Sequence, residues 1–154
     1  MQNNWLELAE KVLDYGVMGT LLLMSVVALW LFIERLMYYR AVDVKTYESK
    51  ELLELDLSDN LSTISAIGAN APYVGLLGTI LGIMITFYGL GEIGTVDTKK
   101  VMTGLALALK ATGFGILVAI PSIVFYTALL RKMERLLTYW EVGGRRQGNG
   151  PDAA

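Results

Sequence analysis

The sequence from Tyr15 to Ile33 reads YGVMGTLLLMSVVALWLFI and contains no charged side chain. An α-helix rises about 1.5 Å per residue, so this stretch covers the hydrocarbon core of a bilayer, which is roughly 30 Å thick. Aromatic and basic side chains follow it, as is typical of the end of a membrane span. We therefore predict a transmembrane helix over residues 15–40.

Two further apolar blocks follow the first. The block from Ala71 to Leu90 contains no charge, and the block from Val101 to Leu130 contains only Lys110. The last block is longer than one crossing needs, so we predict a helix over 101–142 that spans the membrane and extends into the cytoplasm. A soluble domain would instead scatter its leucines along amphipathic segments. The predicted fold class is all-α: an integral membrane protein with three transmembrane helices and long cytoplasmic helical extensions.

The chain contains neither cysteine nor histidine. This absence excludes disulfides, zinc sites of the usual ligand types, and nucleophiles activated by histidine. The phosphate-binding loop of Walker-type ATPases is also absent, and no basic patch interleaves with aromatic residues. We therefore expect no enzyme activity, no metal, no cofactor and no nucleic-acid partner.

The segments between the blocks are short and polar. Residues 1–14 predict an amphipathic helix on the membrane surface or, as an alternative, the first turns of the first span. Residues 41–70 predict a cytoplasmic segment of two short helices, broken near residues 58–60 by a Ser-Asp-Asn turn and capping sequence. Residues 91–100 predict a loop, and the glycine-rich tail 143–154 is predicted to be disordered.

Basic side chains are concentrated after the first block and after the third. They are Arg35, Arg40, Lys45, Lys50, Arg131, Lys132, Arg135, Arg145 and Arg146. The opposite side carries only Lys11, Lys99 and Lys100. Because positively charged loops stay in the cytoplasm, we predict a cytoplasmic C-terminus and an outward-facing N-terminus. In a bacterium with two membranes, this places the chain among the lipids of the inner membrane with its N-terminus in the periplasm.

The three blocks contain no Asp, Glu or His, although proton relays through membranes normally use such groups. A carboxylate for proton transport would therefore have to come from a partner subunit. The blocks offer small and hydroxylated residues at spacings of three and four, which place them on one face of each helix. These are Gly75, Thr79, Gly82 and Thr86 in the second block, and Ala108, Thr112, Gly115, Ala119, Ser122 and Tyr126 in the third.

Two explanations of these faces stay open. Small residues let helix backbones approach closely, so ordinary helix packing would use the same pattern. Alternatively, the faces accept a foreign helix and hydrate a proton path, with Gly78, in a G-x-x-x-G pair with Gly82, and Lys110 as candidate partner contacts. Lys110 is expected to snorkel outward or to pair with a carboxylate of a partner, with a transport role as the alternative. Pro121 is predicted to kink the third helix.

Two stretches resemble signatures of the ExbB, TolQ and MotA family. Residues 69–82 read ANAPYVGLLGTILG, which is similar to the family's second-span pattern A-P-x-x-G-L-L-G-T-V-x-G. Residues 108–115 read ALKATGFG, and AIPS follows at 119–122, which resembles the third-span pattern A-L-x-A-T-A-x-G-L-x-x-A-I-P-A. The chain looks most like a short ExbB, because a MotA protein would have four spans.

The resemblance implies a homopentameric ring around the transmembrane helices of an ExbD-like dimer, each subunit of which is a single-span protein with an intramembrane aspartate. Such complexes use the proton motive force to drive a TonB-like protein and outer-membrane uptake. The family's two pore threonines correspond here to Thr79 and Thr112. A TolQ-like envelope role and a non-conducting membrane scaffold remain alternatives. Two departures stand out: Leu107 replaces a glutamate found in many members, and segment 41–70 is much shorter than its common counterpart.

Overall fold

The described part of the chain forms three long α-helices, one short α-helix and a 3₁₀ turn. The computed structural model describes residues 3–93 and 98–148. The elements in order are α1 (Asn3–Ala41), the 3₁₀ turn η1 (Val44–Thr46), α2 (Lys50–Ser58), α3 (Leu61–Ile93) and α4 (Thr98–Gly148). Segments apolar and long enough to cross a membrane cover Leu8–Ala41, Leu61–Gly91 and Val101–Gly144. The prediction of an all-α chain with three long apolar helices is therefore confirmed.

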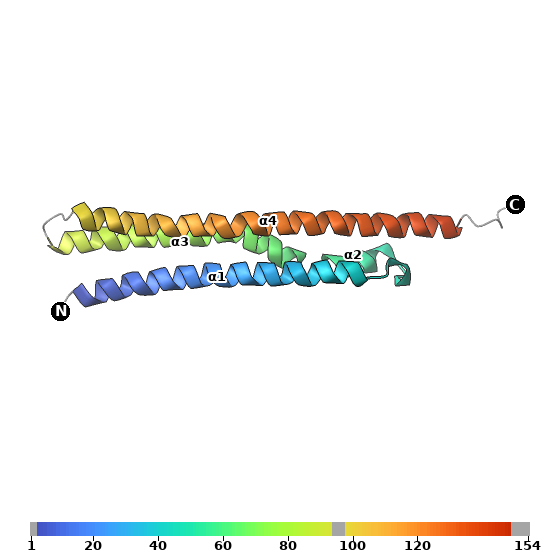
Figure 1. Ribbon diagram of the computed structural model, residues 1–154, viewed down its shortest axis with the longest axis horizontal. Coiled ribbons are helices and arrows are strands. Elements are labelled where there is room, and N and C mark those ends of the chain that lie inside the picture. The colour runs from blue at the N-terminus through green and yellow to red at the C-terminus, as the bar shows by residue number, and fades with distance from the viewer. Residues whose placement is uncertain (1–2, 94–97, 149–154) are drawn as a thin grey trace.

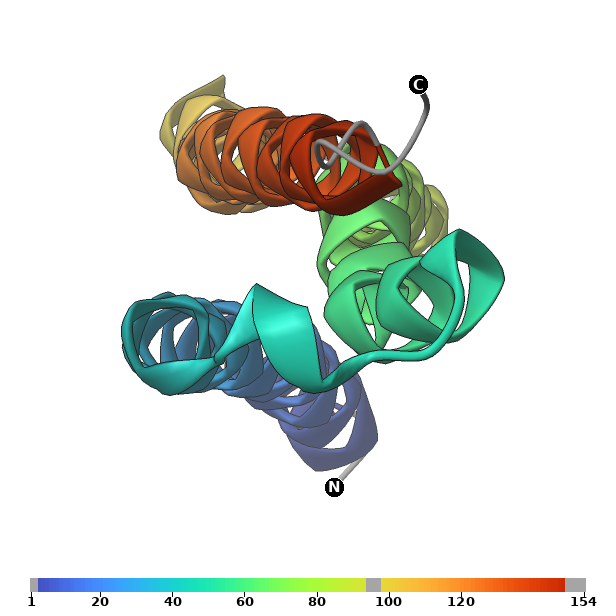
Figure 2. The ribbon, with the colours of Figure 1, turned by 90° about the vertical axis from the view of Figure 1, so that its right-hand side faces the viewer.

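The long helices lie side by side along the longest axis of the molecule (Figure 1). α3 and α4 form an antiparallel hairpin, and α1 packs against both of them. Seen end on, the three helices occupy the corners of a triangle (Figure 2). The N-terminal end of α1 lies near the C-terminal end of α3 and the N-terminal end of α4, whereas α2 lies toward the opposite end. The segments predicted to face outward and those predicted to face the cytoplasm thus gather at opposite ends.

The helix boundaries at the N-terminal end favour one of the two interpretations of residues 1–14. α1 starts at Asn3 and continues without a break into the apolar block, so the described part of this segment forms the first turns of the first span. No proline stands between the two parts, and a helix that has already formed extends at little further cost. The predicted loop 91–100 is also shorter, since α3 continues to Ile93 and α4 starts at Thr98.

The predicted helix break between the first and second spans is present. Ser58 ends α2, and Asn60 has a φ of 60°, a left-handed conformation that asparagine tolerates better than most residues. The second short helix predicted before residue 71 is not separate, because α3 runs from Leu61 through Pro72. Leu61 and Ile64 are buried in the bundle and anchor this extension.

The C-terminal tail departs from its predicted disorder in part. α4 continues to Gly148, whereas we predicted that the helix ends at residue 142. Glycine disfavours helix in general, which motivated the prediction, but the preceding helix removes the cost of nucleation. Residues 149–154 lie outside the described part of the chain.

Two clusters of buried side chains hold the helices together. One joins the end of α1 to α2, α3 and α4, and consists of Tyr39, Leu53, Leu57, Leu61, Ile64, Leu129 and Met133. The other lies in the middle of the bundle and consists of Leu21, Ala28, Ile67, Ala71, Val118 and Ala119. Many large apolar side chains elsewhere are exposed, such as Leu22, Trp30 and Leu117. This outward apolar surface is what a lipid environment requires of a membrane protein.

Candidate functional site

The helices α3 and α4 touch through two glycines. A Cβ added to Gly75 would lie 3.1 Å from the Cα of Gly115, and a Cβ added to Gly115 would lie 3.1 Å from the Cα of Gly75. The same added atoms would come within 2.6 Å of the Ala111 carbonyl oxygen and 2.7 Å of the Ala71 carbonyl oxygen, respectively. The two backbones are therefore in direct contact, and this contact leaves no room for a side chain.

One turn along α3 from Gly75, the close approach brings two hydroxyl groups together. Thr79 on α3 is buried, with 8% of its surface exposed, whereas Thr112 on α4 is partly exposed at the edge of the crossing. Their Oγ1 atoms share a short hydrogen bond. Thr79 Oγ1 also lies 3.0 Å from the Ala108 carbonyl oxygen and 3.2 Å from the Gly75 carbonyl oxygen. The structure thus brings together the two threonines singled out in the sequence.

The hydroxyl pair can be satisfied in two ways without a charge. Each hydroxyl has one proton to donate and can also accept. If Thr112 donates to Thr79, then Thr79 donates to the carbonyl of Ala108. If Thr79 donates to Thr112, then Thr112 donates to the carbonyl of Gly75, 3.5 Å away. Because the hydrogen-bond direction can reverse, the pair can accept from or donate to a polar group that arrives at the exposed edge.

The other predicted face residues pack within this chain. Gly82 lies against Ala108, where an added Cβ would be 3.0 Å from the Ala108 Cβ, and Thr86 donates to the Gly82 carbonyl at 2.9 Å. Ser122 is buried and donates to the Val118 carbonyl at 2.8 Å. The remaining two belong to the core clusters: Ala119 to the central one and the partly buried Tyr126 to the one at the α2 end. Close helix packing therefore accounts for most of these small residues, and a role as pore wall stays a prediction.

The two predicted partner contacts also lie inside the bundle. A Cβ on Gly78 would come within 2.8 Å of the Val17 side chain and 2.9 Å of the Ala111 side chain, so Gly78 lies where all three long helices meet. Lys110 pairs with Asp14 of α1 at 2.9 Å between Nζ and Oδ2. Its carboxylate thus comes from the same chain rather than from a partner.

Asp14 is the residue that the sequence reasoning missed. A lone lysine within an apolar helix calls for a counter-charge, and Asp14 is the last charged residue before the first apolar block. These two observations could have identified Asp14 as the partner of Lys110. The pairing across ninety-six positions of sequence, however, depends on how α1 lies along α4.

Two further observations concern the helix around Pro121 and the possibility of a metal site. α4 runs through Pro121 as one continuous helix, and the proline is exposed on its surface. Within residues 3–93 and 98–148, no group of three or more Asp and Glu residues is arranged to hold a metal ion.

The chain matches one protein family over most of its length. Residues 32–142 match the family described as the MotA/TolQ/ExbB proton channel family. This range contains α2, α3, both threonines of the hydroxyl pair and most of α4.

Two curated relatives match this chain over most of both lengths, and a third is covered only in part. The biopolymer transport protein ExbB of Aquifex aeolicus is 52% identical over 136 residues, which are 88% of this chain and 92% of that protein. A putative biopolymer transport protein, ExbB-like 2, of Helicobacter pylori is 50% identical over 133 residues, 86% of this chain and 89% of the relative. The Tol-Pal system protein TolQ of Pseudomonas aeruginosa is 36% identical over 98 residues, 64% of this chain and 41% of that protein.

Proposed function

The chain belongs to the MotA/TolQ/ExbB proton channel family, and on that premise we propose that it is the channel and stator subunit of a proton-driven motor. In this proposal it works as an ExbB protein does: a homopentamer surrounds an ExbD-like single-span partner, and the complex energises a TonB-like protein for outer-membrane transport. Family membership and the three apolar helices make the chain an integral protein of the inner membrane. The proposal adds an N-terminus in the periplasm and a C-terminus in the cytoplasm.

The observation that carries the proposal is the hydroxyl pair of Thr79 and Thr112. It is uncharged, lies between two membrane helices, and reaches an exposed edge through Thr112. A charged group buried at this depth would be costly, whereas hydroxyls and a free choice of hydrogen-bond direction are compatible with the apolar surroundings. The pair therefore suits a site at which a partner's carboxyl group pauses in its protonated or ionised form.

The mechanism follows from the charge on that partner carboxylate. Protonation removes its charge and lets it move past the apolar helix surfaces of the ring. One elementary charge that crosses a potential of 100 mV releases about 2.3 kcal/mol. Because a fivefold ring cannot dock symmetrically on a twofold partner, each proton would move the partner from one inequivalent position to the next. Thr79 and Thr112 supply the hydrogen bonds at each pause.

The test replaces one hydroxyl by a methyl group. Thr112→Val keeps the shape of the side chain but removes the exposed hydroxyl, and we expect at least a tenfold loss of proton flux in proteoliposomes of the complex, isolated together with its copurifying partner. Thr127→Val is the matched control, because Thr127 lies on an exposed face of the same helix and donates only to its own Ile123 carbonyl at 2.8 Å. Equal flux in wild type and Thr112→Val would refute the assigned role.

Partner capture tests the assembly. Affinity purification of this chain from its own cells should recover a single-span protein with an aspartate in its span. A complex that lacks such a protein contradicts the proposal. If the captured proteins are instead Tol-Pal components, the TolQ-like alternative is the correct one. The 36% identity to TolQ supports that alternative.

One observation favours a second candidate, a scaffold without ion flux. The glycines of the predicted pore face are used to pack α3 on α4 of the same chain. A scaffold would need nothing more. The absence of proton flux through a complex that contains its partner with an intact aspartate would support the scaffold over the motor.

A further inference from the structure

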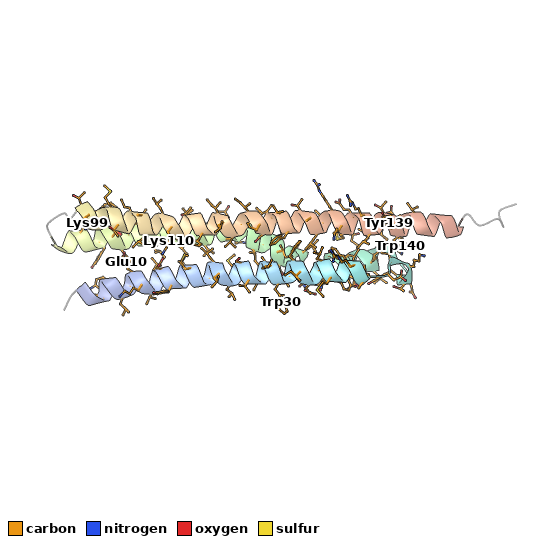
Figure 3. The ribbon with its side chains drawn as sticks, in the orientation of Figure 1. Glu10, Trp30, Lys99, Lys110, Tyr139 and Trp140 are labelled. Atoms are coloured by element: carbon orange, nitrogen blue, oxygen red, sulfur yellow. The ribbon has the colours of Figure 1, made fainter. Side chains whose placement is uncertain are left out.

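A cavity with a mainly apolar wall and three charged side chains lies between α1 and the hairpin of α3 and α4. Its volume is about 390 Å³, and it opens between the N-terminal part of α1 and the hairpin of α3 and α4. This is several times the space that one water molecule needs. Successive turns of α1 line it with Glu10, Lys11 and Asp14. Figure 3 shows Glu10 on α1 and Lys110 on α4 near the same end of the bundle.

The charges around the cavity balance. Glu10 and Asp14 are acidic, Lys11 is basic, and Lys110 places its ammonium group 2.9 Å from Asp14. The side chains of Asp14 and Lys110 are 40% and 35% exposed, so the helices enclose neither of them completely. Lys110 does not itself line the cavity, but without Asp14 its ammonium group would leave an unbalanced positive charge next to the cavity and repel cations. Without Lys110, the cavity would contain a net negative charge and attract them.

The floor of the cavity adjoins the threonines. It is formed by Gly78, Gly82, Ala108 and Ala111, which lack bulky side chains. Thr79 donates to the carbonyl oxygen of Ala108 at 3.0 Å. Ala111 directly precedes Thr112 in the sequence. Ala108 therefore contacts both the cavity, through its lining position, and the hydroxyl pair, through its carbonyl oxygen.

We propose that this cavity is the outer, water-filled mouth of the ion path, and that Asp14 admits cations to it by neutralising Lys110. The ligand is a small monovalent cation, a hydrated proton or sodium. The inference rests on the proposed function, and it adds a site on α1 to a path otherwise placed between the ring and its partner. It also gives Lys110 a role: its charge sets how strongly the mouth attracts cations.

The first experiment uses the absence of cysteine from this chain. Leu107→Cys places a thiol on the wall of the cavity, and small membrane-impermeant methanethiosulfonates are added to right-side-out vesicles that contain the full complex. We expect rapid labelling from the outer side. Leu109→Cys is the matched control, because Leu109 is more exposed in the single chain, at 63%, but does not line the cavity. Equal rates at the two positions, or labelling only from the cytoplasmic side, overturn the proposal.

The second experiment measures the field inside the cavity. The ratio of labelling rates for a cationic and an anionic reagent at Leu107→Cys should fall about thirtyfold in Asp14→Asn and rise about thirtyfold in Lys110→Gln, because one unit charge about 4 Å away in water changes each rate about fivefold, in opposite directions for the two reagents. The double variant should return to the wild-type ratio. Glu10→Gln removes a charge from the cavity without touching the ion pair, and its ratio should fall as in Asp14→Asn. The opposite result is also clear. If Glu10→Gln leaves the ratio of labelling rates unchanged while Asp14→Asn and Lys110→Gln change it in the same direction, the ion pair is only structural and the proposal is wrong.

Ion flux separates this inference from the proposed function. In proteoliposomes with an imposed potential, Asp14→Asn should lower the flux severalfold, and Lys110→Gln should preserve or raise it. Parallel runs with a proton-sensitive and a sodium-sensitive dye identify the cation. A conducting complex in which the two variants lose flux equally contradicts the cation mouth but leaves the threonine mechanism intact. A complex that does not conduct at all contradicts the proposed function. The labelling ratios alone then show whether the charges of Asp14 and Lys110 control the electric field in the cavity.

Discussion

Two regions of the bundle, the crossing of α3 and α4 and the end that carries α2, are held together by different chemistry. At the crossing of α3 and α4 the contacts are glycine backbones and uncharged hydroxyls, as for Gly75 and Thr79. At the end that carries α2, Arg35 is buried and binds Glu34 at 3.2 Å and Asp59 at 3.1 Å. The comparison teaches that charge is used where water is near, whereas close approach and hydroxyls replace it between membrane helices.

The α2 end also uses a carboxylate as a junction. Asp56 accepts short hydrogen bonds from the hydroxyls of Tyr38 on α1 and Tyr47 after η1. The hydroxyl of Tyr38 is the main cause of the lowered pKa of Asp56, and that of Tyr47 adds to it. Trp140 on α4 donates to the Tyr47 carbonyl at 3.1 Å. This network joins α1, α2 and α4 without the close backbone contacts that are seen at the crossing of α3 and α4.

The largest effect is expected from a cavity at the α2 end. Leu57 is fully buried in the cluster with Tyr39 and Leu129. Leu57→Ala should lower the free energy of unfolding by about 3 kcal/mol, because neighbouring side chains fill such a cavity only in part. Leu55→Ala is the control, since Leu55 is 71% exposed on the same helix. Thermal unfolding of the purified protein in detergent measures both, and equal losses would contradict the assignment of this cluster as core.

The next largest effect is expected at the crossing of α3 and α4, from a substitution that forces the two helix backbones apart. Gly75→Ala adds a Cβ that would lie 2.6 Å from the Ala111 carbonyl oxygen, so the helices must separate. Overpacking of this kind costs about 2 kcal/mol, and the separation should also weaken the contact between Thr79 and Thr112. Gly113→Ala is the control, because its added Cβ meets no atom within 4 Å. Detergent-stability measurements in which Gly75→Ala matches Gly113→Ala would show that the backbones are not in contact.

A smaller effect should appear as a pH dependence confined to the α2 end. The folded pKa of Asp56 lies below its ordinary value of 3.8. The stability that it contributes is therefore fully present above about pH 4 and is lost as the pH falls through the folded pKa. Melting temperatures measured below pH 4 should fall more steeply in wild type than in Asp56→Asn. Parallel curves for the two proteins would argue against ionised Asp56 as the junction.

The smallest effect is expected from the surface of the same end. Lys50 pairs with Glu141 across α2 and α4, but both side chains are well exposed. Exposed ion pairs gain little because water and salt screen them. Lys50→Gln should leave the melting temperature unchanged within error, while Arg35→Gln, which removes the buried partner of Asp59, should lower it clearly. A large loss in Lys50→Gln would mean that charge matters at this end regardless of burial.

Much of the fold was predictable because a membrane span can be identified from its own stretch of sequence. Long charge-free blocks predict spans without knowledge of their neighbours, and the break near Asn60 was visible as capping residues. The positions of Thr79 and Thr112 on the small faces of their helices were predictable as well, because they follow from spacings of three and four, whereas the hydrogen bond between the two was not. The joined start of α3 at Leu61 was not predictable, since Pro72 suggested a boundary and the burial of Ile64 is a tertiary fact.

The sequence by itself determined the all-helical class, the three spans and the two small faces, because these depend on hydrophobic length and on the 3.6-residue repeat of a helix. Only the tertiary structure decided that the glycines of both faces meet each other, that Lys110 finds its carboxylate in Asp14, and that a cavity with charged side chains in its wall lies beside α1. The physical reason is that periodicity states which residues share a face, whereas the partner of that face depends on how helices distant in sequence pack.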